Sequence, residues 1–356
     1  MKKKNLKKLL CLTAAFALCL ALAACSGGAG DTQSSDTGSA APADTGSDGG
    51  DAGNAEEIKI GIIQLVNHPS LNNCYEGTIQ GLAEAGYVDG ENGVTIDTKV
   101  ADGKSETTDM MAKTMVSSGY DMIIAIATPA AMSAYSAARD AGIPVIYSAV
   151  SDPISAGLAK DLDDPQTGAS GTKDALNLEG QMQMIRALLP EAETIGILYT
   201  TSEPNSLSHL EAFEALAGQY GFEIVAQGIT NEAEVSSGAA ALVAKGVDCV
   251  NNFTDNNVVN NLSTLLHATD EAGIPVFGSE EEQVRNGCVA SESLDYVALG
   301  VTTGEMAASV LSGEADIMSL PVAVVADSTP VYSQANLDKF GITLPEEYAG
   351  AVNLDE

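Results

Sequence analysis

The sequence predicts an α/β fold made of two similar lobes, each built around a parallel sheet. Strand patterns alternate with helical patterns in the first half of the chain, which is typical of a parallel sheet covered by helices. The second half repeats this order. The residues AGIPV occur in both halves, as Ala141–Val145 and Ala272–Val276. In each copy Gly ends a helix, Pro sets an extended entry, and Ile and Val begin a buried strand.

The N-terminal segment has the composition of an export signal. A basic start precedes an apolar run that is too short for a stable transmembrane helix. The following Leu22-Ala23-Ala24-Cys25 resembles a bacterial lipobox, which predicts lipid attachment at Cys25. The alternative is a plain signal peptide with an accidental cysteine. We expect residues 1–24 to be a lipoprotein signal peptide and residues 25–56 to be the lipidated Cys and a flexible acidic linker, because 26–55 lack Ile, Leu, Val and aromatic residues.

Three strands and three helices stand out in the first lobe. The strand patterns EIKIGIIQL, YDMIIAIA and VIYSAV are apolar enough to be buried, and the helical patterns between them end at Gly. The predicted strands are Glu57–Leu65, Tyr120–Ala127 and Val145–Val150, and the predicted helices are Cys74–Gly86, Glu106–Gly119 and Pro129–Gly142.

The second lobe contains corresponding elements in the same order. ETIGILYT corresponds to the first strand, FEIVAQGI to VTIDTKVA, GVDCVNNFTD to the YDMIIAIA strand and AGIPVFGSE to the last strand. Two later stretches complete the chain: Gly287–Gly313 reads as a short strand followed by a helix, and Ser319–Ser333 as a strand.

Charge and cysteine usage exclude several classes of function. The formal net charge is -33, so a phosphate backbone would be repelled and nucleic acid is not expected as a partner. Beyond the signal and Cys25, the cysteines Cys74, Cys249 and Cys288 form no C-x-x-C pair, and the histidines His68, His209 and His267 lack metal-ligand spacing. We therefore expect no metal and no cofactor.

Polar loops follow the predicted strands in both lobes. In open α/β sheets, ligands bind outside the carboxyl ends of the strands, where helix N-termini attract anions. Taken singly, each loop is more readily interpreted as a helix cap. The set of six converging loops predicts a ligand cleft between the lobes. The loops are Gln64–Asn73, Ala127–Ala131, Ser148–Gly157, Tyr199–Ser206, Asn251–Asn257 and Phe277–Glu282.

At these loops the sequence resembles a known family. The ordered motifs HPSL, IATPAA, SDPISAGL, EPNS, FTDNNVV and IPVFGSEEE resemble the substrate-binding lipoproteins of bacterial ABC importers, in the branch associated with tryptophan and other aromatic amino acids. The resemblance covers about residues 57 to 345. Two departures concern the ligand: Asn72 or Asn73 stands where an aspartate is frequent, and Asn251, Asn252 and Phe253 stand where many members have aromatic or hydroxyl residues.

The resemblance implies a type I periplasmic-binding-protein architecture, with two Rossmann-like lobes that are joined by three crossovers and close on the ligand. By the family's wiring, residues 57–173 plus 284–317 would form the N-terminal lobe and residues 174–283 plus 318–356 the C-terminal lobe. The implied partners are an ABC permease and its ATPase. The membrane would be contacted through the N-terminal lipid only.

A zwitterionic amino acid sets the requirements for the site. Its carboxylate would meet Thr128, the N–H groups of Ala130 and Ala131, Asn205 and Ser206. Its ammonium would meet Asp255 or Glu280, with Asp152 and Glu203 in reserve. A planar side chain would lie against Tyr147, Tyr199 or Phe253, or beside His68 and Pro69. The complete set of residues expected at the ligand is Gln64, His68, Pro69, Thr128, Pro129, Ala130, Tyr147, Ser148, Asp152, Tyr199, Glu203, Asn205, Ser206, Phe253, Asp255, Asn256, Ser279 and Glu280.

Two other classes of function use a parallel α/β sheet. An α/β enzyme is disfavoured because the sequence has no G-x-S-x-G elbow, no phosphate-binding P-loop and no G-x-G-x-x-G after its first strand. A nucleoside- or sugar-binding lipoprotein, or a sensory binding protein, would use the same two lobes and stays open as an alternative.

Overall fold

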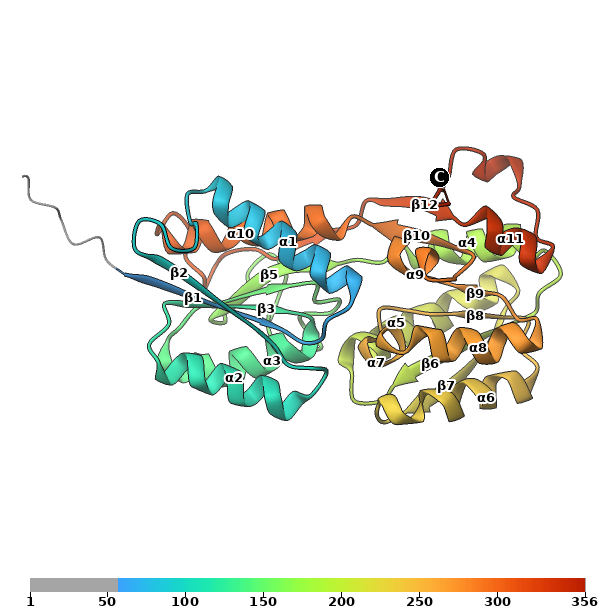
Figure 1. Cartoon of the computed structure of the whole chain (residues 1–356), viewed down its shortest axis with the longest axis horizontal. Coiled ribbons are helices and arrows are strands. Elements are labelled where there is room, and N and C mark those ends of the chain that lie inside the picture. The colour runs from blue at the N-terminus through green and yellow to red at the C-terminus, as the bar shows by residue number, and fades with distance from the viewer. Residues whose placement is uncertain (1–56, 356) are drawn as a thin grey trace, which may run out of the picture. The chain divides into compact units, whose positions relative to one another are not determined.

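The computed structural model describes residues 57–355 and confirms the predicted α/β class (Figure 1). Its strands form three sheets, of which the two larger ones are entirely parallel. The expected signal peptide, Cys25 and the linker lie outside the described residues. No helix in the described part is both long and apolar enough to cross a membrane.

The first sheet has six strands in the order β11-β5-β4-β3-β1-β2. The predicted strands of the first lobe form its centre, and the isoleucine-rich β3 is buried along its whole length. We call this sheet and the helices packed on it the first half. Its strands are β1 (Ile58–Gln64), β2 (Val94–Val100), β3 (Met122–Ile126), β4 (Val145–Ser148), β5 (Ala169–Asp174) and β11 (Ala323–Val325).

Helices cover both faces of this sheet (Figure 1). The helices α1 (Pro69–Glu84) and α10 (Tyr296–Leu311) lie side by side on one face, and α2 (Ser105–Ser117) and α3 (Thr128–Ala138) lie on the other. α1 begins five residues before the predicted start at Cys74, because Pro69 is suited to the first turn of a helix.

Close contact between α1 and α10 depends on glycine. A Cβ atom on Gly77 would overlap the carbonyl oxygen of Val297, and one on Gly300 would overlap the carbonyl oxygen of Cys74. Gly81 and Gly304 repeat this arrangement one turn further along. The backbones therefore approach closely, which fixes the start of α10 relative to α1.

The second sheet has four parallel strands in the order β7-β6-β8-β9. Alternate side chains of β6 enter two different cores: Ile195 and Ile197 pack with α4 and α5, whereas Leu198 packs with α6 and α8. We call this sheet and its helices the second half. Its elements are β6 (Thr194–Thr200), β7 (Glu223–Ile229), β8 (Cys249–Asn251), β9 (Val276–Phe277), α4 (Leu178–Leu188), α5 (Pro204–Ala217), α6 (Val235–Lys245) and α8 (Leu262–Ala272).

A third sheet, β10-β12-β13, lies next to the second half. Val289 N donates to Val276 O and Gly278 N donates to Ala290 O, which joins β10 to the β9 region. The remaining elements are β10 (Ala290–Leu294), β12 (Ser328–Tyr332), β13 (Val352–Asn353), α7 (Asn256–Asn260), α9 (Glu281–Arg285), α11 (Gln334–Phe340) and the 3-10 turns η1 (Arg139–Ala141), η2 (Gly218–Tyr220), η3 (Glu232–Glu234) and η4 (Glu346–Tyr348).

These pairings correct the predicted boundaries between the lobes. The chain passes between the halves after β5, before α10 and after β11, so three crossovers are present. However, β10, expected with the first lobe, pairs with β12, and β11, expected with the second lobe, pairs with β5. Which sheet a short strand joins is set by its tertiary partner, and the local pattern carries no signal for that choice.

The repeated AGIPV has the predicted structure in both places. Gly142 and Gly273 adopt left-handed backbone conformations, with φ of 69° and 71°, and end η1 and α8. β4 then begins at Val145 and β9 at Val276. The two copies are equivalent helix-to-strand connections, one in each half.

Candidate ligand-binding pocket

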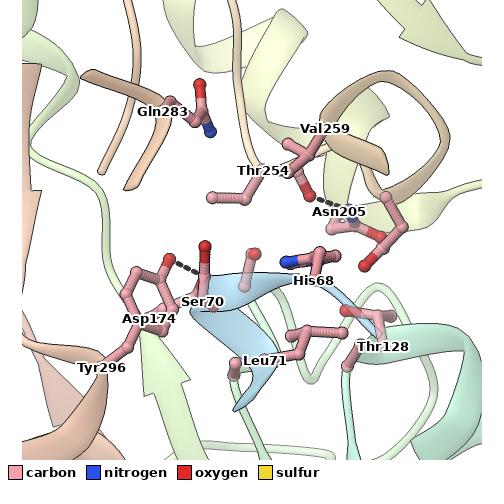
Figure 2. Close-up of a pocket in the computed structure, with 14 residues that line it drawn as sticks. His68, Ser70, Leu71, Thr128, Asp174, Asn205, Thr254, Val259, Gln283 and Tyr296 are labelled. Carbon is pink, nitrogen blue, oxygen red and sulfur yellow. Dashed lines mark hydrogen bonds between the residues drawn. The ribbon is translucent and has the colours of Figure 1, made fainter. Parts of the chain in front are cut away.

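A pocket lies between loops of the two halves (Figure 2). About 370 Å³ of space, part of it open to solvent, lies among its lining atoms. The first half and α10 supply His68, Ser70, Leu71, Ala127, Thr128, Ala149, Ser151, Asp174 and Tyr296, and the second half supplies Asn205, Thr254, Asn256, Val259 and Gln283.

Three helices begin at this pocket with a shared N-terminal design. α1, α3 and α5 each carry Pro in the first turn, and none has a hydrogen bond from its N-cap side chain. By contrast, α7, α9 and α10 are capped by Asp255, Glu280 and Asp295. An uncapped N-terminus leaves N–H groups free and has a partial positive charge. The pocket is thus suited to an anionic group such as a carboxylate.

Two alanines at the pocket have strained backbones. Ala127, at the start of α3, has a φ of 82°, and Ala149, after β4, has a φ of 55°. Residues with a Cβ rarely adopt such conformations, which cost on the order of 1–3 kcal/mol each. Strain of this kind concentrates at functional sites, and here it occurs where β3 and β4 meet the pocket.

Asp174 is a buried carboxylate at one side of the pocket. Its side chain is 2% exposed, and its Oδ2 accepts a hydrogen bond of 3.1 Å from the Tyr296 hydroxyl. Oδ1 has no partner. Burial raises the pKa of Asp174 to about 6, which leaves it mainly ionised at pH 7. A cationic group on a ligand would satisfy both the free oxygen and the buried charge.

Four further buried polar atoms at the pocket have no partner. They are His68 Nδ1, Ser70 Oγ, Asn205 Oδ1 and Thr254 Oγ1. Buried polar atoms are normally hydrogen-bonded, so a group of unsatisfied ones around one space indicates a polar ligand. Burial lowers the pKa of His68 to about 4, so its imidazole is neutral at pH 7. Leu71 and Val259 add apolar surface beside these atoms (Figure 2).

Four of the residues expected from the sequence line the pocket: His68, Thr128, Asn205 and Asn256. Pro69 and Glu280 line an adjacent groove, which shares His68 with the pocket. Pro129 and Ala130 lie in the first turn of α3, next to Thr128.

Asp255, expected to meet the ligand's ammonium, is placed differently. Its carboxylate is fully buried and accepts hydrogen bonds from Thr200 N, Thr200 Oγ1, Ser206 Oγ and Val258 N. It caps α7 and does not line the pocket. With four donors already in place, Asp255 has no free oxygen lone pair aimed at a ligand, and the expectation is corrected. Ser206 is occupied by the same network.

The other expected acids also have protein partners. Glu203 accepts from Asn205, Asn256 and Asn257, and burial, with the nearby charge of Asp255, raises its pKa to about 8. Glu280 caps α9, and burial raises its pKa to about 7. Asp152 accepts from Ser155 N and from Ser208 Oγ of the second half.

The expected aromatic residues are not at the pocket. Phe253 is fully buried against His209 and Phe213, and Tyr147 is fully buried in the first core. Tyr199 packs against the second core. Apolar residues at the ends of central strands are drawn into the cores, and this displaces the expected aromatic wall. Gln64, Ser148 and Ser279 are likewise hydrogen-bonded within the protein.

Sequence reasoning missed several pocket residues. Asp174 ends β5 and Tyr296 lies just after β10, and neither strand forms a long apolar run. β5 reads ASGTKD, and its burial comes from α10, whose Thr303 shares a 2.9 Å hydrogen bond with Thr172. A carboxylate at the end of such a strand was the available signal. Six pocket residues lie in the predicted loops but were not singled out: Ser70, Leu71, Ala127, Ala149, Ser151 and Thr254. Four lie outside those loops: Asp174, Val259, Gln283 and Tyr296.

Comparisons with known proteins agree with this geometry. Residues 59–351 match the family model described as ABC transporter substrate binding protein. A tyrosine-binding protein of Clostridioides difficile (strain R20291) is 36% identical over 282 residues, which are 79% of this chain and 80% of the relative. An ABC domain from Streptococcus pneumonia, solved in complex with L-Trp, is 35% identical with a TM-score of 0.80, covering 83% of this chain and 98% of that one. A ligand-free, open substrate-binding protein from Clostridium difficile is 36% identical with a TM-score of 0.63, at the same coverage.

Proposed function

Because this chain belongs to the family of ABC transporter substrate-binding proteins, we propose that it captures an aromatic amino acid outside the cytoplasm and delivers it to an ABC permease with its ATPase. The observation that carries the choice of ligand is the chemistry of the pocket. A buried anion at one side and uncapped helix N-termini at another match the two charges of a zwitterion.

The α-ammonium group is assigned to Asp174. Its unpartnered Oδ1 is the pocket's negative charge, and Tyr296 holds the other oxygen. The α-carboxylate is assigned to the N-termini of α1 and α3, where Ser70 and Thr128 supply hydroxyls beside free N–H groups. The ligand's side chain then lies toward Leu71 and Val259. An amino acid that filled these positions would satisfy two of the unpartnered atoms, Asp174 Oδ1 and Ser70 Oγ.

The relatives support an aromatic ligand. One is a tyrosine-binding protein, and another was solved with L-Trp. The described fold is also more similar to the Trp complex than to the ligand-free, open structure, although the identities are nearly equal. This supports a mechanism in which the two halves close on the ligand. Solved structures bound to sugars and polyols are below 25% identity, so they bear on the fold alone.

Lipid anchoring at Cys25 is part of the proposal. Cys25 precedes the described residues, so its support is the lipobox-like Leu22-Ala23-Ala24-Cys25. Changing Cys25 to Ala should move the protein from the membrane fraction to the soluble fraction. Retention of the Cys25→Ala protein in the membrane would remove the lipid anchor from the proposal.

The ligand is tested by thermal stabilisation of the purified protein. A ligand at a hundred times its Kd adds about 2.7 kcal/mol to the free energy of unfolding. We expect tyrosine or tryptophan to raise the Tm, and nucleosides and sugars to leave it unchanged. The chain has no Trp, so bound tryptophan can be followed directly by its fluorescence. Stabilisation by sugars or nucleosides alone would refute the assignment of an aromatic amino acid as the ligand. Chemical conversion of the added compound by the protein would refute a role in binding alone.

A further inference from the structure

Asn205 presents a hydrogen-bond acceptor to the pocket that nothing in the protein satisfies. The side chain lies in the first turn of α5 and is 3% exposed. Its Nδ2 donates to Glu203 Oε2 at 3.1 Å and to the Thr254 carbonyl at 3.2 Å. Its Oδ1 is buried and has no partner.

The orientation of this amide is fixed by its neighbours. Turning it over would place Oδ1 against a carboxylate oxygen and a carbonyl oxygen, which are both acceptors. Glu203 Oε2 is itself held by the backbone N–H and the side-chain amide of Asn256. Nδ2 is therefore used within the protein, and Oδ1, on a residue that lines the pocket, is the atom left without a partner.

The acceptor lies away from the site assigned to the ligand's ammonium. Asp174 and Tyr296 are at one side of the pocket, whereas Asn205, Thr254 and Val259 are at the other (Figure 2). A ligand carboxylate cannot pair with Oδ1, because both are acceptors. A ligand ammonium has the charged Asp174 as its stronger partner. The group that reaches Asn205 thus belongs to the ligand's side chain.

We propose that Asn205 Oδ1 accepts a hydrogen bond from a donor on the ring of the bound amino acid, so that the pocket selects tyrosine or tryptophan against phenylalanine. This inference rests on the proposed function and specifies its substrate class. The phenol O–H and the indole N–H are such donors, and the phenyl ring has none. Thr254 Oγ1, also unpartnered, adds a second polar atom at the same side.

The selectivity comes from the penalty for leaving Asn205 unpaired. A ligand without a donor displaces water from a buried acceptor and returns no hydrogen bond. We expect phenylalanine to bind on the order of 10- to 100-fold more weakly than the better of tyrosine and tryptophan. 4-Methyl-L-phenylalanine is the sharper probe, because it has nearly the shape of tyrosine with a methyl group in place of the hydroxyl.

The experiment measures Kd by calorimetry for L-tyrosine, L-tryptophan, L-phenylalanine and 4-methyl-L-phenylalanine. In Asn205→Leu, tyrosine and tryptophan should fall to the affinity of the donor-free ligands, whose own Kd should change less than threefold. Asn336→Leu is the matched control, because Asn336 lies in α11 and donates to the Cys288 carbonyl, outside the pocket. That variant should keep the wild-type preference.

Each result bears on the inference. Equal binding of tyrosine, tryptophan and 4-methylphenylalanine by the wild type would overturn it, even if Asn205→Leu fails to fold. An equal loss of all four ligands in Asn205→Leu would also overturn it, because Asn205 would then contact a group that they share. If the wild type binds none of the four, the proposed function falls together with the inference.

Discussion

The hydroxyl of Tyr296 donates a 3.1 Å hydrogen bond to Oδ2 of Asp174, although the two residues are 122 positions apart. Asp174 ends β5, just before the chain first crosses to the second half. Tyr296 begins α10, just after the chain crosses back to the first half. The contact is available because α10 is held tightly on α1 and against β5. It leaves one carboxylate oxygen free at the pocket.

Replacing Asp174 by Asn should nearly abolish ligand binding. The ligand's ammonium would then be buried without a counter-charge, at a cost of about 3–5 kcal/mol, which corresponds to an increase in Kd of about two to three or more decades. Asp121→Asn is the control, because Asp121 is exposed and lies before β3, at the opposite end of the sheet. Calorimetric titration of both variants with tyrosine or tryptophan tests the assignment. A Kd within threefold of the wild type in Asp174→Asn would contradict it.

Ligand affinity should fall in mildly acidic solution. Burial raises the pKa of Asp174 to about 6 in the unliganded protein, and a bound ammonium lowers it again. Binding below pH 6 therefore requires loss of a proton, and Kd should rise by up to about tenfold per pH unit. His68, with a pKa of about 4, stays neutral from pH 5 to 8.

Through Asp174, the stability of the unliganded protein should change with pH in the opposite direction to ligand affinity. Since its pKa is higher in the folded protein than in the unfolded chain, folding takes up a proton between about pH 4 and 6, and the free energy of unfolding falls as pH rises through this window. Asp174→Asn should flatten the profile of Kd and remove only its own part of the slope in stability, because the pKa values of Glu203 and Glu280 are raised as well. A wild-type Kd that is constant from pH 5 to 7 would argue against Asp174 as the ammonium partner.

The sequence predicted the fold better than the chemistry of the pocket. Apolar runs such as that of β3 and the two AGIPV connections carry strong local signals, and the structure agrees with them. β5 carries none, because its Thr172 is buried by hydrogen bonding to α10 and not by hydrophobicity. Without β5, Asp174 could not be placed at a strand end.

Asp255 was placed after a strand correctly, but its role could not be predicted. A carboxylate after a strand can cap the next helix or face a ligand, and the residue type is the same in both roles. The choice depends on whether Thr200 and Ser206, both more than 45 positions away, come within hydrogen-bonding distance. Local sequence does not contain that information.

Replacing Asp255 by Asn should therefore destabilise the fold more than it affects the pocket. Its carboxylate accepts four hydrogen bonds, and an amide group would turn N–H donors toward some of these donors. We expect the free energy of unfolding to fall by about 2–4 kcal/mol. In Asp295→Asn, where one oxygen caps α10 through two backbone N–H groups, the loss should stay below about 1 kcal/mol. Denaturant unfolding of both variants decides the point, and an unchanged midpoint for Asp255→Asn would contradict it.

The packing of α1 on α10 should be sensitive to a single methyl group. A Cβ on Gly77 would overlap the Val297 carbonyl oxygen, and since this neighbour is backbone, it cannot turn aside. The helices must separate, so Gly77→Ala should lower the free energy of unfolding by about 1–3 kcal/mol or more. Val297 adjoins Tyr296, so the shift should also move the Tyr296 hydroxyl from Asp174 and weaken ligand binding.

The control variant is Gly218→Ala. Its new Cβ meets nothing within 4 Å and the backbone is not left-handed, so stability should be unchanged or slightly higher. Denaturant unfolding and ligand titration of the two variants measure both effects, and wild-type stability with wild-type Kd in Gly77→Ala would show that close packing of these helices does not set the position of Tyr296.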